Sequence, residues 1–466
     1  MDTKLETALA ALTKPKSIAV VGASERKNSV GYGVLKGLVH GCVFESRACT
    51  PYPGNVYAVN PHAQTILGKR CYPRLQDIPG EVECAVVAVP SAIVPQILKD
   101  AAAKKVKAAI VISAGFAELG ERGKKLQQEV AAIAKKAGIR LLGPNVLGIL
   151  VPPNNYNASF ALTTPEPGRI AFISQSGALA DSVVDWALEA KYGFSLIASL
   201  GNAADLNESD FLEYCLQDPH TKAIAMYLES VHDGPRFLKV ASRAAKSKPI
   251  IVLKGGKGER GGRAVASHTG SLAGSYAVYE AALRQAGVFL ADSVEDLFDL
   301  ARALSEQPRT KGKNVAIVTN GGGVGVVTAD YCEQMGLDVV PLKESTLKKL
   351  DASKLMHPAS SRANPLDLVG DALPQRYEMA ANTLLAEPYV DGLIVIQTLQ
   401  TMTDSKKDAE VVVKAQQRFP EKPVVAVFMG GKYSAPGVAV LRKHNIPDYN
   451  DPLKAVKVMK VLCGVV

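Results

Sequence analysis

The sequence predicts an α/β protein of several domains, each built on a mainly parallel sheet with helices on both faces. Short β-branched runs such as "SIAVVGAS", "CAVVAVP" and "RIAFISQSG" alternate with Ala-, Lys- and Glu-rich stretches such as "KKLQQEVAAIAKKAG". This alternation is typical of strand–helix units. The runs are almost continuously apolar, which favours parallel strands buried on both faces. The 466 residues are too many for one ordinary hydrophobic core.

Two polar, proline-containing stretches are predicted to join the domains: "VPPNNYN" at 151–157 and "SEQPRTKGK" at 305–313. They divide the chain into three predicted domains, over 1–148, 149–306 and 307–466. The N-terminal "MDTKLETALAALTKPKS" predicts a short amphipathic helix before the first strand. Many of the predicted strands end in small residues. Because ligands of open α/β sheets bind at the carboxyl ends of strands, we expect several anion sites there.

The composition favours a soluble globular protein over a membrane or nucleic-acid-binding protein. Hydrophobic residues make up 47% of the chain and charged residues 21%. We find no apolar run long enough to cross a bilayer and no signal-peptide core, so we expect a cytoplasmic location. The net charge is +9, but the basic residues are spread along the chain and there is one Trp. This distribution suits polyphosphate ligands better than nucleic acid.

The cysteines show no CxxC pair, and no metal site is predicted. An odd, scattered set favours buried thiols in a reducing cytoplasm. The seven cysteines are Cys42, Cys49, Cys71, Cys84, Cys215, Cys332 and Cys463.

The first block contains a candidate coenzyme site. Its first strand enters "VGASERKNSVGYG" at 21–33, where small residues let a phosphate approach backbone N–H groups at the next helix start. The glycine spacing departs from the dinucleotide pattern GxGxxG, so an ordinary turn remains the alternative. The turns "AVPSA", "SAGF" and "GPNVLG" follow later strands and together outline the rim of one site. The coenzyme-binding candidates are Gly22, Ser24, Arg26, Asn28, Val89, Pro90, Ser113 and Asn145.

The second block contains "FISQSGALADSVVDWA" at 172–187, in which a strand ends and a helix opens. Hydroxyl groups and free N–H groups at a helix N-terminus form a ready anion site, so Gln175, Ser176 and Gly177 are candidates for phosphate or acyl binding. Plain N-capping by serine is the alternative. Glu229 ends the later strand "AIAMYLE" and is either a surface charge or the partner of a cation or imidazole.

One histidine stands out in "GGKGERGGRAVASHTGSLAG", which begins at Gly255. The stretch up to Gly262 is too rich in glycine to form a rigid element, and helical pattern resumes at Ser271. We therefore expect His268 near the N-terminus of a helix, at the end of a flexible loop. An imidazole there can accept a phosphoryl group and then move, with a carboxylate to fix its tautomer. An ordinary polar loop histidine is the alternative, and the other six histidines are expected to be structural or superficial.

The third block contains a second strand–glycine–helix junction, "TNGGGVGVVTADYCEQMG" at 319–336. Gly322 and Gly323 either bind an anion at the helix start or allow tight backbone packing.

The order of these motifs resembles the acyl-CoA synthetases that form a nucleoside diphosphate, and most closely the α subunits of ADP-forming acetyl-CoA synthetase, known mainly from archaea. This family is related to succinyl-CoA synthetase. The resemblance covers essentially the whole chain, and the set of motifs is specific although most single motifs are not. It implies a Rossmann-like CoA-binding domain followed by two flavodoxin-like domains. It also implies that His268 is the phosphorylated histidine and that Glu229 supports it.

The resemblance further implies an acid–thiol ligase that converts acetyl-CoA, ADP and phosphate to acetate, ATP and CoA. The reaction passes through an acyl phosphate and a phosphohistidine on a swinging loop. No stretch resembles an ATP-grasp domain, so we expect half an enzyme. A β subunit would bring that domain with ADP/ATP and Mg²⁺, in an α₂β₂ assembly. Val146 follows Asn145, and no basic residue presents itself for a second carboxylate, which favours a small monocarboxylic acid over succinate.

Two other function classes stay open on the sequence. A catalytically silent CoA-binding regulatory module would share the scaffold, but His268 is intact and no acetyltransferase domain is present. A nicotinamide-dependent dehydrogenase would use the first block, but the glycine pattern is imperfect and "VYAVN" is followed by no clear acidic residue for the ribose.

Overall fold

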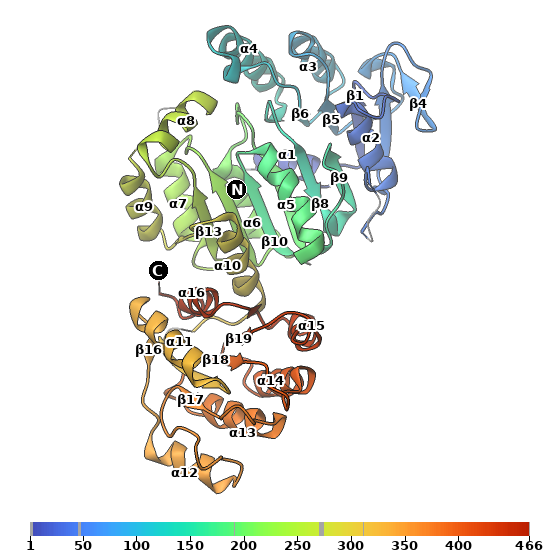
Figure 1. Ribbon diagram of the computed structural model, residues 1–466. Helices are drawn as coiled ribbons and strands as arrows, with labels where there is room; N and C mark the ends of the chain where they lie inside the picture. Colours follow the sequence, from blue (N-terminus) through green and yellow to red (C-terminus); the bar gives the residue numbers. More distant parts are fainter. Residues whose placement is uncertain (1–2, 45–47, 191, 270–274, 311, 466) are drawn as a thin grey trace. The chain divides into compact units, whose positions relative to one another are not determined.

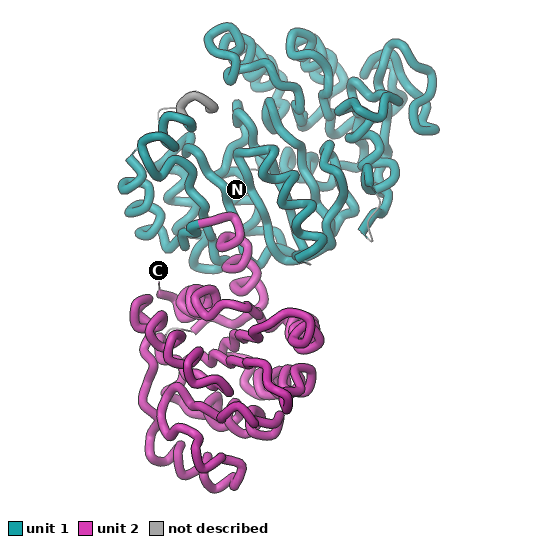
Figure 2. The backbone as a smooth tube through the Cα atoms, in the orientation of Figure 1, with its two compact units in different colours: residues 1–292 teal, residues 293–466 magenta. Residues whose placement is uncertain are grey.

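The computed structural model describes residues 3–465 except 45–47, 191, 270–274 and 311, and it leaves undescribed the side chains of 266–269. The chain divides into two compact units, residues 1–292 and 293–466 (Figure 2). Three parallel-dominated sheets and their helices confirm the predicted α/β class (Figure 1). The bounds of the three predicted domains remain a prediction.

The first sheet of unit 1 has seven strands in the order β3-β4-β2-β1-β5-β6-β7, and only the β3–β4 pair is antiparallel. The strands are β1 Ser17–Val21, β2 Asn55–Val59, β3 Thr65–Ile66, β4 Lys69–Tyr72, β5 Cys84–Val87, β6 Ala108–Val111 and β7 Arg140–Leu142. The helices of this region are α1 Thr3–Thr13, α2 Val30–His40, α3 Val94–Ala103 and α4 Glu121–Ala137. Helix α1 confirms the predicted N-terminal helix.

The second sheet of unit 1 has the order β14-β13-β12-β10-β11-β8-β9. Its strands are β8 Gly148–Val151, β9 Tyr156–Ser159, β10 Pro167–Ser174, β11 Phe194–Ser199, β12 Ala223–Leu228, β13 Ile250–Lys254 and β14 Phe289–Leu290. Its helices are α5 Gly177–Ala190, α6 Glu208–Gln217, α7 Gly234–Ala244, α8 Glu259–Thr269 and α9 Tyr276–Gln285. Four of its strand pairs are parallel, whereas β8 pairs antiparallel with both β11 and β9.

The predicted joint at 151–157 is wrong, because this stretch forms the turn of the β8–β9 hairpin. The polar "PPNN" sequence makes a tight turn at a sheet edge, and Asn155 ends that turn in the left-handed region with φ 50°. A turn signal of Pro and Asn is the same in a hairpin and in a linker. The hairpin therefore extends the second sheet of unit 1.

The two sheets of unit 1 share a hydrophobic core. Along β1, Ile18 and Val20 belong to one buried cluster, whereas Ala19 and Val21 belong to another. The sheet is thus buried on both faces, as its continuous apolar strands predict. The cluster around Ile18 also contains Ile173 of β10, in the second sheet. This shared core explains why two sheets make one compact unit.

Unit 2 has six strands in the order β16-β15-β18-β19-β20, with β17 paired beside β15. They are β15 Asn314–Thr319, β16 Asp338–Val339, β17 Leu366–Asp367, β18 Gly392–Gln397, β19 Val424–Phe428 and β20 Asp448–Tyr449. The helices are α10 Val294–Glu306, α11 Gly322–Gln334, α12 Glu344–Ala352, α13 Pro374–Leu385, α14 Ser405–Arg418, α15 Ala435–Lys443 and α16 Pro452–Leu462. The central strands β18 and β19 are buried along their whole length.

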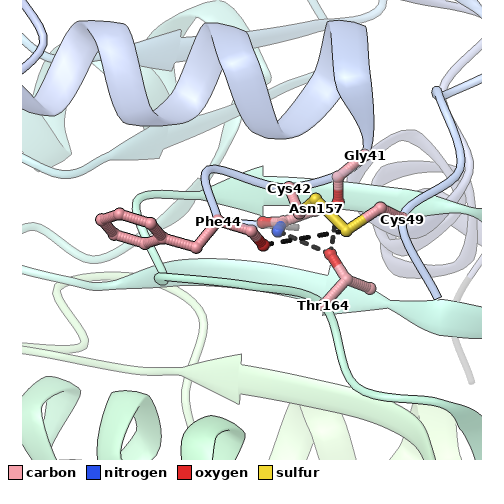
Figure 3. The surroundings of a disulfide bond; sticks show 6 residues. All are labelled: Gly41, Cys42, Phe44, Cys49, Asn157 and Thr164. Carbon is pink, nitrogen blue, oxygen red and sulfur yellow. Dashed lines mark hydrogen bonds between the residues drawn. A yellow bond between two sulfur atoms is a disulfide. The ribbon is translucent and has the colours of Figure 1, made fainter. Parts of the chain in front are cut away.

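A disulfide joins Cys42 and Cys49, with 5.4 Å between their Cα atoms (Figure 3). Beside it, the Thr164 hydroxyl donates to the Gly41 carbonyl at 2.6 Å and accepts from the Asn157 amide at 2.8 Å. The expectation of buried thiols is therefore wrong for these two cysteines. The other five are free and buried. The pair forms although the sequence lacks a CxxC motif.

Within the described part of the chain, no helix is both long enough and apolar enough to cross a bilayer.

Candidate ligand cavity at the strand ends of unit 1

A cavity of about 700 Å³ lies in unit 1 where the carboxyl ends of strands from both sheets converge. Residues that follow β5, β6 and β7 of the first sheet line it together with residues that follow β10, β11 and β12 of the second. This is the place where open α/β sheets bind ligands. Seven of the predicted binding residues line this cavity: Val89, Pro90, Ser113, Asn145, Gln175, Ser176 and Gly177.

The wall from the first sheet is fixed by bonds between its own turns. The Ser113 hydroxyl donates to the Val89 carbonyl, and the Asn145 N–H donates to the Ser113 carbonyl at 3.0 Å. Asn145 adopts a left-handed conformation with φ 63°, which Asn tolerates better than most residues. Its side-chain amide donates to the Asn202 amide oxygen at 3.4 Å. The turn after β7 is therefore tied to the loop after β11.

Helix α5 begins at the cavity, and serine hydroxyl groups accept hydrogen bonds from backbone N–H groups at its start. The Ser174 hydroxyl accepts from the Ser176 N–H at 3.1 Å, and the Ser176 hydroxyl accepts from the Leu179 N–H at 3.2 Å. Ser176 thus caps the helix, as its alternative interpretation predicts, while it also lines the cavity. An added Cβ at Gly177 would be in ordinary van der Waals contact with the Leu147 nitrogen at 3.4 Å and the Ser199 hydroxyl oxygen at 3.6 Å, so packing does not require glycine at this position.

Gln175 spans two loops. Its amide oxygen accepts from the N–H groups of Glu229 at 2.6 Å and Ser230 at 3.0 Å, and its amide NH₂ donates to the Ser230 carbonyl at 2.8 Å. With these bonds made, the side chain positions the loop after β12. Its contribution to the cavity is therefore the shape of the wall.

Glu229 is 6% exposed and follows β12 directly, so the surface-charge alternative does not hold. The Tyr227 hydroxyl donates to its carboxylate at 3.4 Å. Burial, and next the Glu229 charge, raise the pKa of Tyr227 to about 12. Lys254 is also buried, and its ammonium donates to the carbonyl oxygens of Glu229 at 2.7 Å and Gly255 at 2.6 Å. Burial lowers the pKa of Lys254, and the Glu229 charge opposes this effect.

His268 falls inside helix α8, near its end, so its predicted position at a helix N-terminus is wrong. Helix α8 starts at Glu259 and includes Gly261 and Gly262, which the sequence analysis assigned to a flexible loop. Its glycine-rich first turn packs closely, with an added Cβ at Gly261 only 3.3 Å from the Gly256 Cα. The His268 side chain lies outside the described residues, and so does the stretch from 270 to 274.

Four predicted coenzyme residues lie outside the cavity lining: Gly22, Ser24, Arg26 and Asn28. Arg26 and Asn28 are exposed in the loop before α2. Gly22 has φ 92°, and an added Cβ would lie 2.3 Å from the carbonyl oxygen of Ala88, which lines the cavity. The loop therefore adjoins the cavity wall through Gly22, and Val30 after it is a lining residue.

Sequence reasoning missed several lining residues, including Asp181, Gly201, Asn202, Ser230 and His232. Asp181 is held by the Leu162 N–H at 3.3 Å, and burial raises its pKa. Asn202 and Gly201 follow β11 in "SLGNAADLN", which has the same small-residue ending as the other strands. That ending was the signal available for them. His232 carried no such signal.

Gly322 and Gly323 open helix α11 in unit 2. The cap residue is Gly321, which has no side chain that could cap the helix. An added Cβ at Gly323 would meet nothing within 4 Å, whereas one at Gly322 would lie 2.7 Å from a carboxylate oxygen of Asp367. The backbone at Gly323 is thus open to a ligand.

Comparisons with known proteins agree along the whole chain. Three protein-family models match it: a CoA binding domain over 16–152, a succinyl-CoA ligase like flavodoxin domain over 167–304 and a ligase-CoA domain over 315–463. The chain is 41% identical over 459 residues to subunit alpha of acetate–CoA ligase [ADP-forming] I of Pyrococcus furiosus, covering 97% of both proteins. It is 42% identical to acetate–CoA ligase [ADP-forming] I of Archaeoglobus fulgidus, of which it spans 62%.

A solved structure has the same fold. The dinucleotide forming acetyl-coenzyme A synthetase 1 of Ca. Korarchaeum cryptofilum, in complex with phosphate and ADP, superposes with a TM-score of 0.92 at 38% identity. The match covers 98% of this chain and 97% of that one. Together with the convergence of predicted binding residues on one cavity, these matches show that the chain belongs to the family of ADP-forming acetate–CoA ligase α subunits.

Proposed function

We propose that this chain is the CoA-, phosphate- and acyl-binding part of an ADP-forming acyl-CoA synthetase, with acetate or another small monocarboxylic acid as substrate. The observation that carries the proposal is the cavity that seven predicted binding residues share. It joins the turns of the block that matches a CoA binding domain to the helix start of the block that matches a succinyl-CoA ligase domain.

The cavity suits the thioester end of an acyl-CoA together with phosphate. Within the described part of the chain its lining contains no Lys or Arg, so an anion would be held by N–H groups at the start of α5, by neutral polar side chains and by His232 when its ring is protonated. Apolar residues such as Val89, Ile112 and Phe160 surround that polar centre. A small acyl group fits such a mixed lining.

The reaction then runs in three transfers. A phosphate oxygen attacks the thioester carbonyl carbon, and the C–S bond breaks to release CoA as its thiol and leave an acyl phosphate. A ring nitrogen of His268 attacks phosphorus, and the carboxylate leaves. ADP finally takes the phosphoryl group from His268 to give ATP. Glu229, buried at the end of β12, would hold the imidazole tautomer and stabilise the phosphorylated ring.

The third transfer requires a nucleotide site that we assign to a partner subunit with an ATP-grasp domain and Mg²⁺. The Pyrococcus furiosus relative is itself a subunit, and the Archaeoglobus fulgidus relative is a longer chain. For this chain, a second polypeptide would supply the nucleotide site that the additional residues would supply in the longer relative. We propose an α₂β₂ assembly of the two subunits.

Incubation of the full chain with acetyl-CoA and labelled phosphate tests the proposal. We expect protein-bound label that survives base and is lost in acid, because a phosphoramidate has this stability. The label should disappear in His268→Ala and persist in the control His220→Ala, which changes an exposed histidine away from the cavity. CoA, but not NAD, should raise the melting temperature.

Absence of label on the chain alone and also after addition of its partner would overturn the ligase proposal. CoA binding without label in both conditions would instead identify a silent CoA-binding module.

A further inference from the structure

His232 joins the two loops that form one wall of the cavity. It lies in the loop after β12, and its ring nitrogen Nδ1 is 3.2 Å from a carboxylate oxygen of Glu208. Glu208 opens helix α6 after the loop that follows β11, and its carboxylate is fully buried. The His232 backbone N–H donates to the other carboxylate oxygen at 2.9 Å. Glu208 therefore holds His232 by ring and backbone together.

The loop after β11 is in turn bound to the first sheet of unit 1. The Asn202 amide NH₂ donates to Glu118 at 2.6 Å and to Gln127 at 2.9 Å, and the Asn202 N–H donates to the Pro144 carbonyl at 3.0 Å. Asn202 and His232 both line the cavity. A displacement of the loop after β12 relative to Asn202 would change the cavity wall on both sides.

We propose that His232 and Glu208 act as a clamp that positions the loops after β11 and β12, and that the clamp sets the affinity of the cavity for CoA and its thioesters. His232 is a positioning residue in this proposal, because it acts on the ligand through the wall that it fixes. The proposal rests on the proposed function and adds to it a residue outside the predicted site.

The clamp depends on the protonation of His232. A buried carboxylate without a cationic partner is costly, so the Glu208 position favours a charged ring. The hydrogen bond with Glu208 raises the pKa of His232, burial opposes it, and the Asn202 backbone adds to the increase. The ion pair of the clamp is therefore complete at low pH and is lost as pH rises through the raised pKa of His232, whereas the bond from the His232 backbone N–H to Glu208 remains.

Carboxylates near this wall would also favour the cation, whereas the guanidinium of Arg236, which donates to Asp210 at 2.6 Å, would oppose it. Asp233 follows His232 and accepts from the Arg236 N–H at 3.0 Å, while Asp181 lines the same cavity. For Glu118, burial raises the pKa, but hydrogen bonds from Asn202 and from three backbone N–H groups lower it overall. Because its pKa is lowered, Glu118 stays ionised over the interval in which His232 titrates. Its bond to Asn202 therefore persists over that interval.

Calorimetric titration of the full chain with CoA between about pH 6 and about pH 9 tests the clamp. The three proteins are the wild type, His232→Gln and His232→Arg. We expect the wild-type dissociation constant to rise roughly fivefold or more with pH. His232→Gln should bind weakly throughout, and His232→Arg, whose charge does not titrate here, should bind tightly throughout.

The titration of CoA itself affects the dissociation constants of all three proteins equally. The pH profile of His232→Arg therefore serves as the reference that corrects for it. Reciprocity adds a second readout, because CoA must raise the pKa of His232 if the protonated form binds it better. Parallel pH profiles in the three proteins, or an unchanged His232 pKa on CoA binding, would overturn the clamp while the proposed function stands. Absence of CoA binding to all three proteins at every pH would overturn both proposals.

Discussion

The two units each bury a carboxylate near the start of a helix, but they stabilise it in opposite ways. In unit 1, Glu208 contacts His232 and the cavity wall. In unit 2, Asp408 lies fully buried on α14, where one carboxylate oxygen accepts from the Gln397 amide at 2.5 Å and the other has no hydrogen-bond partner among the described residues. Burial raises the pKa of Asp408 to about 7, with Gln397 opposing and Asp404 adding to the shift.

The difference between these two carboxylates lies in their partners. Glu208 has a titratable partner at the edge of a cavity, so its environment can respond to ligand and pH. Asp408 is enclosed between β18 and α14, and burial raises its pKa to about 7, so its protonated form predominates below that pH. A neutral acid stabilises the core of unit 2 only while it keeps its proton.

The largest expected effect is the pH dependence that Asp408 gives to unit 2. Its folded pKa lies above the ordinary value of 3.8, so the folded state binds the proton more tightly and the free energy of unfolding falls as pH rises from about 4 to 7. The full fall is up to roughly 4 kcal/mol. Asp408→Asn should remove this slope. Hydrogen exchange of β18 amides, corrected for the intrinsic rate, measures it at several pH values.

Glu410→Gln is the matched control, because it neutralises a half-buried carboxylate on the same helix. It should leave the slope unchanged. A wild-type β18 whose protection is independent of pH would show that Asp408 is ionised in the core, and the contrast between the two units would fail.

A smaller effect is expected from the Glu208–His232 pair. Since His232 is 37% exposed, solvent screens the pair, and we expect a coupling of about 1 kcal/mol at about pH 6. The coupling should shrink towards about pH 9, because the stabilisation from a raised histidine pKa is present below the ordinary value and lost above the folded one. A double-mutant cycle with Glu208→Gln and His232→Gln, measured by hydrogen exchange of β12, tests this. A coupling equal at both pH values would leave only neutral packing between the two side chains.

The sequence predicts site residues well where small residues follow an apolar run and so mark the end of a strand. It predicts them poorly where two contacting residues lie far apart along the chain. Small residues after apolar runs predict the turns that carry Ser113, Asn145 and Ser176, and the structure brings them to one cavity. His232 has no such pattern, because its partner Glu208 comes from another strand–helix unit. The hairpin at 151–157 has the composition of a linker, and only its pairing with β11 places it in a sheet.

Helix α8 shows a different limit of the sequence. Its glycines predict a flexible segment from intrinsic propensity, yet an added Cβ at Gly261 would lie 3.3 Å from the Gly256 backbone, and the helix includes both Gly261 and Gly262. Tertiary packing overrides propensity at such positions. Cys42 and Cys49 lie with their Cα atoms 5.4 Å apart, and the neighbouring Gly41 is bound to Thr164, which the spacing of the cysteines does not reveal.

The variant with the smallest expected change in stability, Gly323→Ala, tests whether unit 2 also binds a ligand. Helices α5 and α11 begin alike: the Ser174 hydroxyl accepts from the N–H two residues on at 3.1 Å, and the Thr319 hydroxyl does so at 2.9 Å. Ser176 then caps α5, whereas Gly321 leaves α11 without a side-chain cap. Gly323→Ala should therefore change stability by at most about 1 kcal/mol, because its Cβ has open space. It should nevertheless lower phosphate-dependent turnover of the assembled enzyme roughly tenfold if phosphate approaches that backbone.

Gly322→Ala is the matched comparison, because its Cβ would lie 2.7 Å from Asp367 and must displace that carboxylate. It should lower the melting temperature as well as turnover, so the two variants separate packing from ligand approach. Gly323→Ala with normal turnover and normal phosphate dependence would remove Gly323 from the predicted anion-binding residues. The packing alternative would then hold for this junction, because Gly322 alone leaves no room for a side chain beside Asp367.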